Sequence, residues 1–184
     1  MLEVMSRLEI IGQGRYLQLL NYNNWEYAER KNVSAIVAIV AEVDGKALIV
    51  EQFRPAVNSR VIEWPAGLVG DIPGQEDEAM ETAANRELEE ETGYRAGRLE
   101  LLISGPASAG MSNEIIHIFR ARDLVKVSSG GGVDNEKITV HLVPLDTVDQ
   151  WLRQRLQEGV MVDLKFHSGL YFLTNDHQNQ SPQL

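Results

Sequence analysis

A single acidic segment, residues 76–94, carries the side chains best suited to chemistry in this 184-residue chain. It reads EDEAMETAANRELEEETGY, with eight acidic residues against one basic residue, Arg86, so its net charge is −7 out of −10 for the whole chain. Like charges three or four residues apart on a helix destabilise it by roughly 0.2–0.5 kcal/mol per pair. The segment therefore contains either solvated carboxylates or carboxylates that bind a cation.

Helical geometry groups three of these carboxylates. At 100° per residue, Glu87, Glu90 and Glu91 fall within an arc of about 100°. A separate apolar row, which can be buried, consists of Met80, Ala84 and Leu88. Mg²⁺ prefers oxygen ligands and commonly pairs a few carboxylates with substrate phosphates. The three carboxylates predict a Mg²⁺ site that binds a phosphate ester, and the alternative is an ordinary solvated acidic face.

Composition narrows the classes of function. The chain has no cysteine, which excludes disulfides, thiolate zinc sites and cysteine nucleophiles. It has no apolar run of 18 residues, so we expect no membrane span, and no cluster of Lys and Arg that could hold a nucleic-acid backbone. The first residues lack a basic stretch followed by an apolar stretch, so we expect no secretory signal and a cytoplasmic location.

Apolar patterns and turn residues predict a mixed fold. We expect a hairpin in 7–22 that is broken near Gly12–Gly14, a second hairpin in 33–53 that turns at Asp44–Gly45, and a helix over 75–92 capped by Gly93. Further strands are expected at 60–64, 99–105, 114–124 and 138–145, helices at 146–159 and 162–176, and a mobile Gly/Ser loop at 126–137. Mixed strands with segregated helices indicate an α+β or α/β sandwich.

RELEEETGY, residues 86–94, resembles the core of the Nudix box, G-x5-E-x7-R-E-U-x-E-E-x-G-U, in which U is aliphatic or aromatic. Glu78 stands at the required distance before Arg86, and every fixed position matches except the first glycine, where the chain has Ile72. Gly67 resembles that glycine displaced by a longer loop, because ten residues separate it from Glu78 instead of five. We therefore expect a Nudix hydrolase.

The flanking segments EQFRPAVNSRVIEWPAGL and GMSNEIIHIFRA, together with the Gly-rich loop, resemble the ADP-ribose pyrophosphatase branch of that family. The resemblance implies an α/β (α+β) fold, the Nudix-fold α/β/α sandwich with a mixed β-sheet and an N-terminal antiparallel β-hairpin. The implied domains are a hairpin in 1–30, exchanged between the subunits of a homodimer, a Nudix hydrolase domain in 31–175, and a polar tail in 176–184.

The resemblance also implies roles for individual residues. The metal ligands would be Glu87, Glu90, Glu91 and the carbonyl of Ala66, with Arg86 holding the glutamates in place. Glu136, on the Gly-rich loop, would be the general base, and the alternative is an ordinary turn residue. The expected substrate-binding residues are Trp25, Glu26, Arg30, Arg54, Glu63 and Met111. A surface salt bridge is the alternative for Arg54, and an interface aromatic is the alternative for Trp25.

One departure from the branch bears on the substrate. ADP-ribose-specific enzymes carry a proline sixteen residues after the glycine that closes the box, and this chain has Ala109 there. We therefore expect Mg²⁺-dependent hydrolysis, with Mn²⁺ as an alternative ion, of nucleoside diphosphate sugars such as ADP-ribose or GDP-mannose to a nucleoside monophosphate and a sugar phosphate. The alternatives are hydrolysis of dinucleoside polyphosphates, NADH or nucleoside triphosphates, and a non-catalytic Nudix module that senses nucleotides.

Overall fold

The structure is a computed structural model that describes residues 8–133 and 136–175. The expected polar tail, 176–184, lies outside the described residues, as do 1–7 and 134–135.

The N-terminal part is a small antiparallel sheet of three strands, β1 (Leu8–Gln13), β2 (Leu17–Tyr22) and β3 (Trp25–Arg30). The predicted hairpin is β1–β2, and β3 adds a strand that the pattern did not show. The β2–β3 turn is formed by Asn23 and Asn24 with φ of 52° and 65°, a conformation that asparagine tolerates better than most residues. The polar sequence WEYAER hid β3, because a strand outside the main core needs no run of apolar residues.

Two further sheets form the body of the molecule. One has the order β8-β4-β10-β9, built from β4 (Ala35–Val40), β8 (Ala66–Val69), β9 (Tyr94–Pro106) and β10 (Ile115–Lys126). The other has the order β11-β6-β7-β12 with β5 beside β6, built from β5 (Glu42–Val43), β6 (Lys46–Arg54), β7 (Ser59–Glu63), β11 (Thr139–Pro144) and β12 (Met161–Val162). The pairs β4–β10 and β7–β12 are parallel, so both sheets are mixed.

The predicted turn at Asp44–Gly45 is present, with φ of 49° and 74°, but it joins only the short strand β5 to β6. The prediction that the two long apolar runs pair with each other is wrong, because β4 belongs to the other sheet. Val37 and Ile39 of β4 enter one core cluster, and Ala38 and Val40 enter the other. A strand buried on both faces shows no alternation that would reveal its partner.

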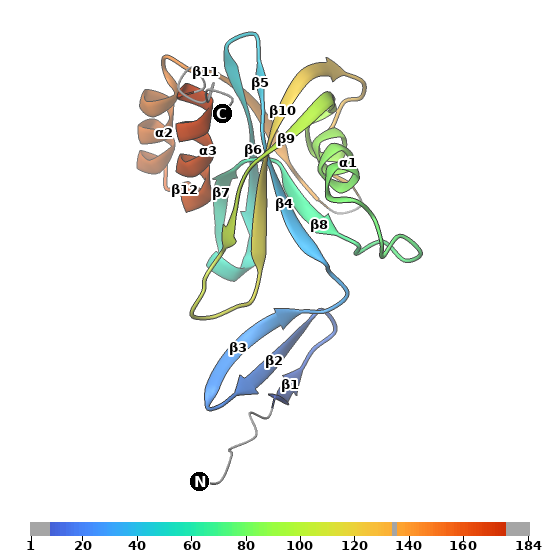
Figure 1. Cartoon of the computed structure of the whole chain (residues 1–184). Helices are drawn as coiled ribbons and strands as arrows, with labels where there is room; N and C mark the ends of the chain where they lie inside the picture. Colours follow the sequence, from blue (N-terminus) through green and yellow to red (C-terminus); the bar gives the residue numbers. More distant parts are fainter. Residues whose placement is uncertain (1–7, 134–135, 176–184) are drawn as a thin grey trace, which may run out of the picture.

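The helices cover opposite faces of the sheets, with α1 (Met80–Thr92) on one side and α2 (Val148–Gln157) and α3 (Leu164–Thr174) on the other (Figure 1). One core cluster lies under α1 and includes the buried Ala84 and Leu88, and the other lies under α2 and α3. This arrangement confirms the α/β/α sandwich. Among the described helices, none is long and apolar enough to cross a membrane.

Helix α1 begins at Met80, five residues later than expected. Residues before it form turns, in which the amide of Gln75 donates to the carbonyl of Ile72 (2.9 Å) and the amide of Glu78 donates to that of Gln75 (3.0 Å). The C-terminal prediction is confirmed, because Gly93 caps the helix with φ of 76°.

Candidate active site

Arg86 organises the carboxylates of α1. Its guanidinium donates from Nε and Nη2 to the two oxygens of Glu78 (3.3 and 3.1 Å), and from Nη1 to Glu87 (2.8 Å) and Glu90 (3.4 Å). A further bond from Nη2 reaches the carbonyl of Leu68 on β8 (3.1 Å) and ties the cluster to the sheet. The planar fork suits such multiple contacts. Arg86 therefore lies as expected, at the centre of the glutamates.

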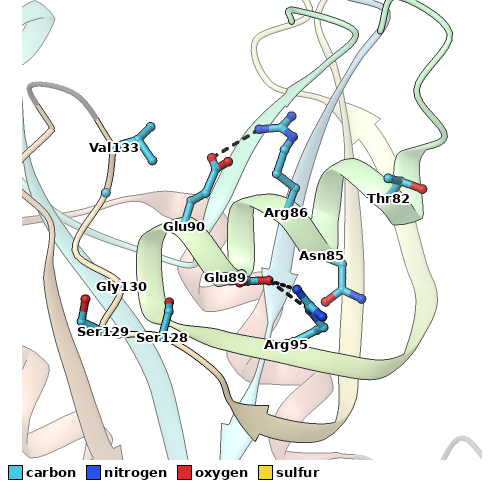
Figure 2. A pocket seen from close by; sticks show the side chains of 11 residues that line it. Thr82, Asn85, Arg86, Glu89, Glu90, Arg95, Ser128, Ser129, Gly130 and Val133 are labelled. Carbon is cyan, nitrogen blue, oxygen red and sulfur yellow. Dashed lines mark hydrogen bonds and ion pairs between the residues drawn. The ribbon is translucent and has the colours of Figure 1, made fainter.

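Glu78 lies two residues before α1, although the sequence predicted that the helix already includes it. Its side chain is only 3% exposed, and its partner is Arg86. Glu89 points away from this cluster, and its carboxylate pairs with Arg95 at 2.6 Å. Strand β9 begins directly after the helix cap and brings Arg95 back alongside the last turn of α1 (Figure 2).

Gly67 lies on β8 directly against the side chain of Glu87. A Cβ at this position would be 1.9 Å from Cδ and 2.1 Å from Oε1 of Glu87. Only glycine allows strand β8 and the carboxylate to come this close. The contact supplies a physical reason to identify Gly67 as the displaced first glycine of the motif, since the longer loop starts after it.

Glu91 is the most buried carboxylate of the row, at 4% exposure, and its Oε2 accepts a hydrogen bond from the amide of Ala66 (3.1 Å). Burial raises the pKa of Glu91 well above its ordinary value, the charges of Glu87 and Glu136 raise it further, and the Ala66 amide and Arg54 oppose the rise. This effect places Glu136 within electrostatic reach of the helix, although it is 45 residues away in the chain.

Burial also raises the pKa of Glu87. The pKa of its carboxyl rises to about 7, against the pull of Arg86 and with the help of the charges of Glu90 and Asp71. Desolvated carboxylates that repel one another favour protonation, or a cation in place of the proton. The chemistry of these donors therefore fits a hard divalent ion.

The three carboxylates share a helix face as predicted, but they do not converge on a point. Within residues 8–133 and 136–175, no group of three acidic or histidine side chains has the arrangement of a finished cation site. Nη1 of Arg86 contacts Glu87 and Glu90, whereas Glu91 accepts from the amide of Ala66. Ala66 lies beside Glu91 as expected. The role of its carbonyl as a metal ligand stays a prediction.

A second ion pair lies next to this row. Arg54, at the end of β6, donates from Nε and Nη2 to both oxygens of Glu63 on β7 (2.8 and 3.1 Å). Arg54 therefore forms a salt bridge, which was the alternative to a role in substrate binding. The pair is not an isolated surface pair, because Arg54 also interacts electrostatically with Glu91. The structure therefore brings Arg54 and Glu63 to the metal-binding candidates.

Glu136 is exposed, and its Oε2 accepts from the amide of Val133 (3.4 Å) within its own turn. A cleft of about 610 Å³ opens beside this loop, between the outer face of α1 and residues 128–133 (Figure 2). Among the described residues that line this cleft are Glu90, one of the three carboxylates, and Arg86, which holds it. The Gly-rich loop thus runs along the helix that carries the carboxylates.

The remaining predicted residues gather elsewhere, where β3 meets the loop 107–114. Arg30 pairs with Glu114 (3.0 Å), and the amide of Ala28 donates to the carbonyl of Met111 (2.7 Å). Trp25 and Met111 are 60% and 68% exposed, and Glu26 is exposed as well. In Figure 1 this sheet and α1 lie at different ends of the molecule, so the structure does not bring these residues to the carboxylates of the same chain.

Lys126 and the backbone of the glycine run at 130–132 were not among the residues predicted from the sequence. Lys126 donates to the carbonyl of Thr92 (2.7 Å) at the end of α1. The three consecutive glycines at 130–132 were a signal, because all three have positive φ. Their contacts with α1 could not be read from the pattern.

Comparison with known proteins gives the same assignment as the motif. Residues 31–162 match the NUDIX domain family. The methanol dehydrogenase activator of Bacillus methanolicus is 33% identical over 170 residues, which are 89% of this chain and 88% of that protein. ADP-sugar pyrophosphatase of Mus musculus is 41% identical over 143 residues (73% and 62%), and GDP-mannose pyrophosphatase of Cronobacter sakazakii is 32% identical over 148 residues (76% and 72%). The crystal structure of an ADP compounds hydrolase has the same fold, with a TM-score of 0.68, 22% identity and 95% of both chains covered.

Proposed function

The chain belongs to the NUDIX domain family and is a hydrolase, and we propose that it cleaves the pyrophosphate bond of nucleoside diphosphate sugars with Mg²⁺ as cofactor. The observation that carries the proposal is the row Glu87, Glu90 and Glu91, in which Arg86 holds the first two carboxylates and the amide of Ala66 on β8 holds the buried Glu91. Burial and mutual repulsion raise the pKa of Glu87 and of Glu91, and a divalent cation bound between them would offset that repulsion.

In this proposal the glutamates and the Ala66 carbonyl hold the cation. A bound divalent cation supplies Lewis-acid stabilisation of the charge that develops on the phosphates. Glu136 takes the proton from the attacking water as general base, and its charge already raises the pKa of Glu91. Arg54, fixed by Glu63, contacts a phosphate or the far sugar.

Two observations support a nucleoside diphosphate sugar as substrate. Sequence relatives include proteins named for ADP-ribose, ADP-sugar and GDP-mannose hydrolysis. Ala109 stands where ADP-ribose-specific members have proline, which favours a broader range of sugars. The products are then a nucleoside monophosphate and a sugar phosphate, and Mn²⁺ is an alternative ion of similar ligand preference.

We also propose a homodimer formed through the N-terminal sheet. Large apolar side chains of β1 and β2 are left at the surface, among them Leu8 (57% exposed) and Ile10 (59%), and Tyr16 before β2 is 64% exposed. Clusters of this kind mark interaction surfaces. A second copy would cover them and would bring its own Trp25 and Glu26 toward the site as nucleobase contacts. Light scattering that gives a mass near the 20.6 kDa of one chain would contradict the dimer.

The test is product analysis with ADP-ribose and GDP-mannose in Mg²⁺ or Mn²⁺, for the wild-type chain, Glu87→Gln and Glu91→Gln. Each variant should lose at least about 10–100-fold in kcat/KM, the loss that even outer-shell changes cause at metal sites. Glu81→Gln is the matched control, because Glu81 is an exposed acid in the first turn of the same helix. Binding of these substrates without turnover would favour a sensor, and faster cleavage of a nucleoside triphosphate or NADH would favour the other hydrolases.

A further inference from the structure

The first half of the Gly-rich loop is hydrogen-bonded to the end of α1. The amides of Val127 and Ser128 both donate to the carbonyl of Gly93, at 2.8 and 3.1 Å. The amide of Gly131 donates to the carbonyl of Glu91 (2.8 Å), and the amide of Gly132 donates to that of Glu90 (3.0 Å). These carbonyls belong to the last turn of a helix, which has no partners for them within the helix.

Lys126 strengthens the same junction. Its Nζ donates to the carbonyls of Thr92 (2.7 Å) and Ser129 (3.4 Å), so one ammonium joins the helix end to the loop. The ammonium also lies over the ring of Tyr94, 4.6 Å from its centroid. A cation at this end complements the partial negative charge of the helix C-terminus.

The junction requires glycine. Gly130, Gly131 and Gly132 have φ of 67°, 106° and 89°, which other residues rarely adopt. A Cβ on Gly130 would lie 2.3 Å from the backbone of Thr92, and a Cβ on Gly132 would lie 2.7 Å from Cβ of Glu136. The carbonyl of Gly131 also accepts from the amide of Ile138 (3.2 Å). This bond joins the backbone before Glu136 to the backbone after it.

We propose that Gly131, Gly132 and Lys126 are positioning residues that hold Glu136 and the last turn of α1 as one unit. Gly131 and Gly132 bind the backbone carbonyls of Glu91 and Glu90, and the proposed function assigns the carboxylates of these two residues to the cation. This inference rests on that proposed function. The sequence predicted a mobile loop over 126–137, but its hydrogen bonds to α1 extend through Gly132. Its task is then to fix the distance between the base and the carboxylates.

The kinetic test compares Gly131→Ala with Gly159→Ala. Both glycines have positive φ, 106° and 82°, and neither has an atom closer than 4.0 Å to a new Cβ, so both substitutions strain the backbone without a clash. The two variants should show similar decreases in Tm. Only Gly131→Ala should lower kcat, by about tenfold or more with KM nearly unchanged, since small misplacements of catalytic groups are costly. Equal kcat in both variants would overturn the inference.

Lys126 offers a second, graded test. Lys126→Met keeps an apolar chain over Tyr94 but removes the cation, and it should lower kcat while leaving KM nearly unchanged. Lys126→Arg should restore part of the loss, because a donor and positive charge return to the helix end. No recovery with Arg, or a loss that is confined to KM, would contradict a positioning role for the cation.

Amide hydrogen exchange in the metal-free wild-type protein separates this inference from the proposed function. The amides of Gly131 and Gly132 should exchange at least about tenfold more slowly than that of Gly110, an exposed glycine of the loop 107–114. Exchange as fast as that of Gly110 would overturn the inference whatever the activity. Slow exchange with no turnover of any nucleotide sugar would instead contradict the proposed function and leave the anchored loop in place.

Discussion

Gly67 and Glu87 lie so close that a single added carbon would overlap: a Cβ on Gly67 would be 1.9 Å from Cδ of Glu87. Gly67→Ala must therefore displace the carboxylate or push α1 from β8. We expect kcat/KM to fall by roughly 10²-fold, since a misplacement of about 1 Å can cost that much. Steady-state kinetics with ADP-ribose measure the effect.

Gly105→Ala is the control for this prediction, because Gly105 also lies in a strand but its new Cβ would have no atom within 4 Å. Its kcat/KM should equal that of the wild type. If Gly67→Ala keeps wild-type activity, the close contact does not position Glu87.

Arg86 should be essential for stability as well as activity. Its side chain is 18% exposed and holds Glu78, whose side chain is 3% exposed, so Arg86→Met leaves a buried carboxylate without its partner. We expect the free energy of unfolding to fall by about 2–4 kcal/mol, and Arg86→Lys to recover only part of it because Lys lacks the fork. Urea denaturation measures both values.

The contrast for that experiment is Arg95→Met. Arg95 is 60% exposed and pairs with Glu89, which is 30% exposed, so this surface pair should contribute less than about 1 kcal/mol. Similar losses in the two variants would mean that the network around Arg86 has no special role.

The metal-free protein should lose stability as the pH rises from about 4.5 to about 7. Glu87 has a pKa of about 7 in the folded chain against an ordinary value of 4.5, because burial and the charge of Glu90 outweigh Arg86. The folded state therefore binds more protons than the unfolded state in this window, and the free energy of unfolding decreases with pH. The raised pKa of Glu91 acts in the same direction.

Glu87→Gln removes the titrating group, so the variant should gain stability relative to wild type as the pH rises, by about 1–3 kcal/mol between pH 5 and pH 8. Urea denaturation in EDTA at several pH values gives the comparison. Parallel curves for the two proteins would contradict the raised pKa. For the same reason, the affinity of the wild type for Mg²⁺ should increase over this range.

Glu51 should show the opposite pH dependence. It is 1% exposed, and although burial alone would raise its pKa, hydrogen bonds from Arg60, His141 and Arg155 lower it. Its contribution to stability is therefore fully present above its ordinary pKa of 4.5 and is lost as the pH falls through the lowered value. Glu51→Gln should cost about 2–4 kcal/mol near pH 7 and less in acid.

Chemical denaturation at neutral and acidic pH tests this prediction, with Glu100→Gln as control. The side chain of Glu100 is 36% exposed, and its partners Arg98 and Arg122 are 60% and 31% exposed, so the control should change stability by less than about 1 kcal/mol. A cost for Glu51→Gln that does not depend on pH would show that shape, and not charge, is what the site needs.

The amino-acid sequence by itself determined the local features of this protein. Helical periodicity placed Ala84 and Leu88 in the core and the carboxylates on another face, the Asp44–Gly45 and Gly93 turns lie where their residue types predict them, and the motif identified the family. These features depend on neighbours within a few positions in the chain, where side-chain chemistry and backbone preference suffice.

Only the tertiary structure decided which distant segments meet. β4 pairs with β10 and not with β6, Gly67 packs against Glu87, and the glycines at 131 and 132 bind the carbonyls of Glu91 and Glu90. A strand that is buried on both faces, a missing side chain and a backbone amide leave no pattern that names their partners. These contacts arise from the packing of two sheets and a helix around shared cores, and packing is a property of the whole chain.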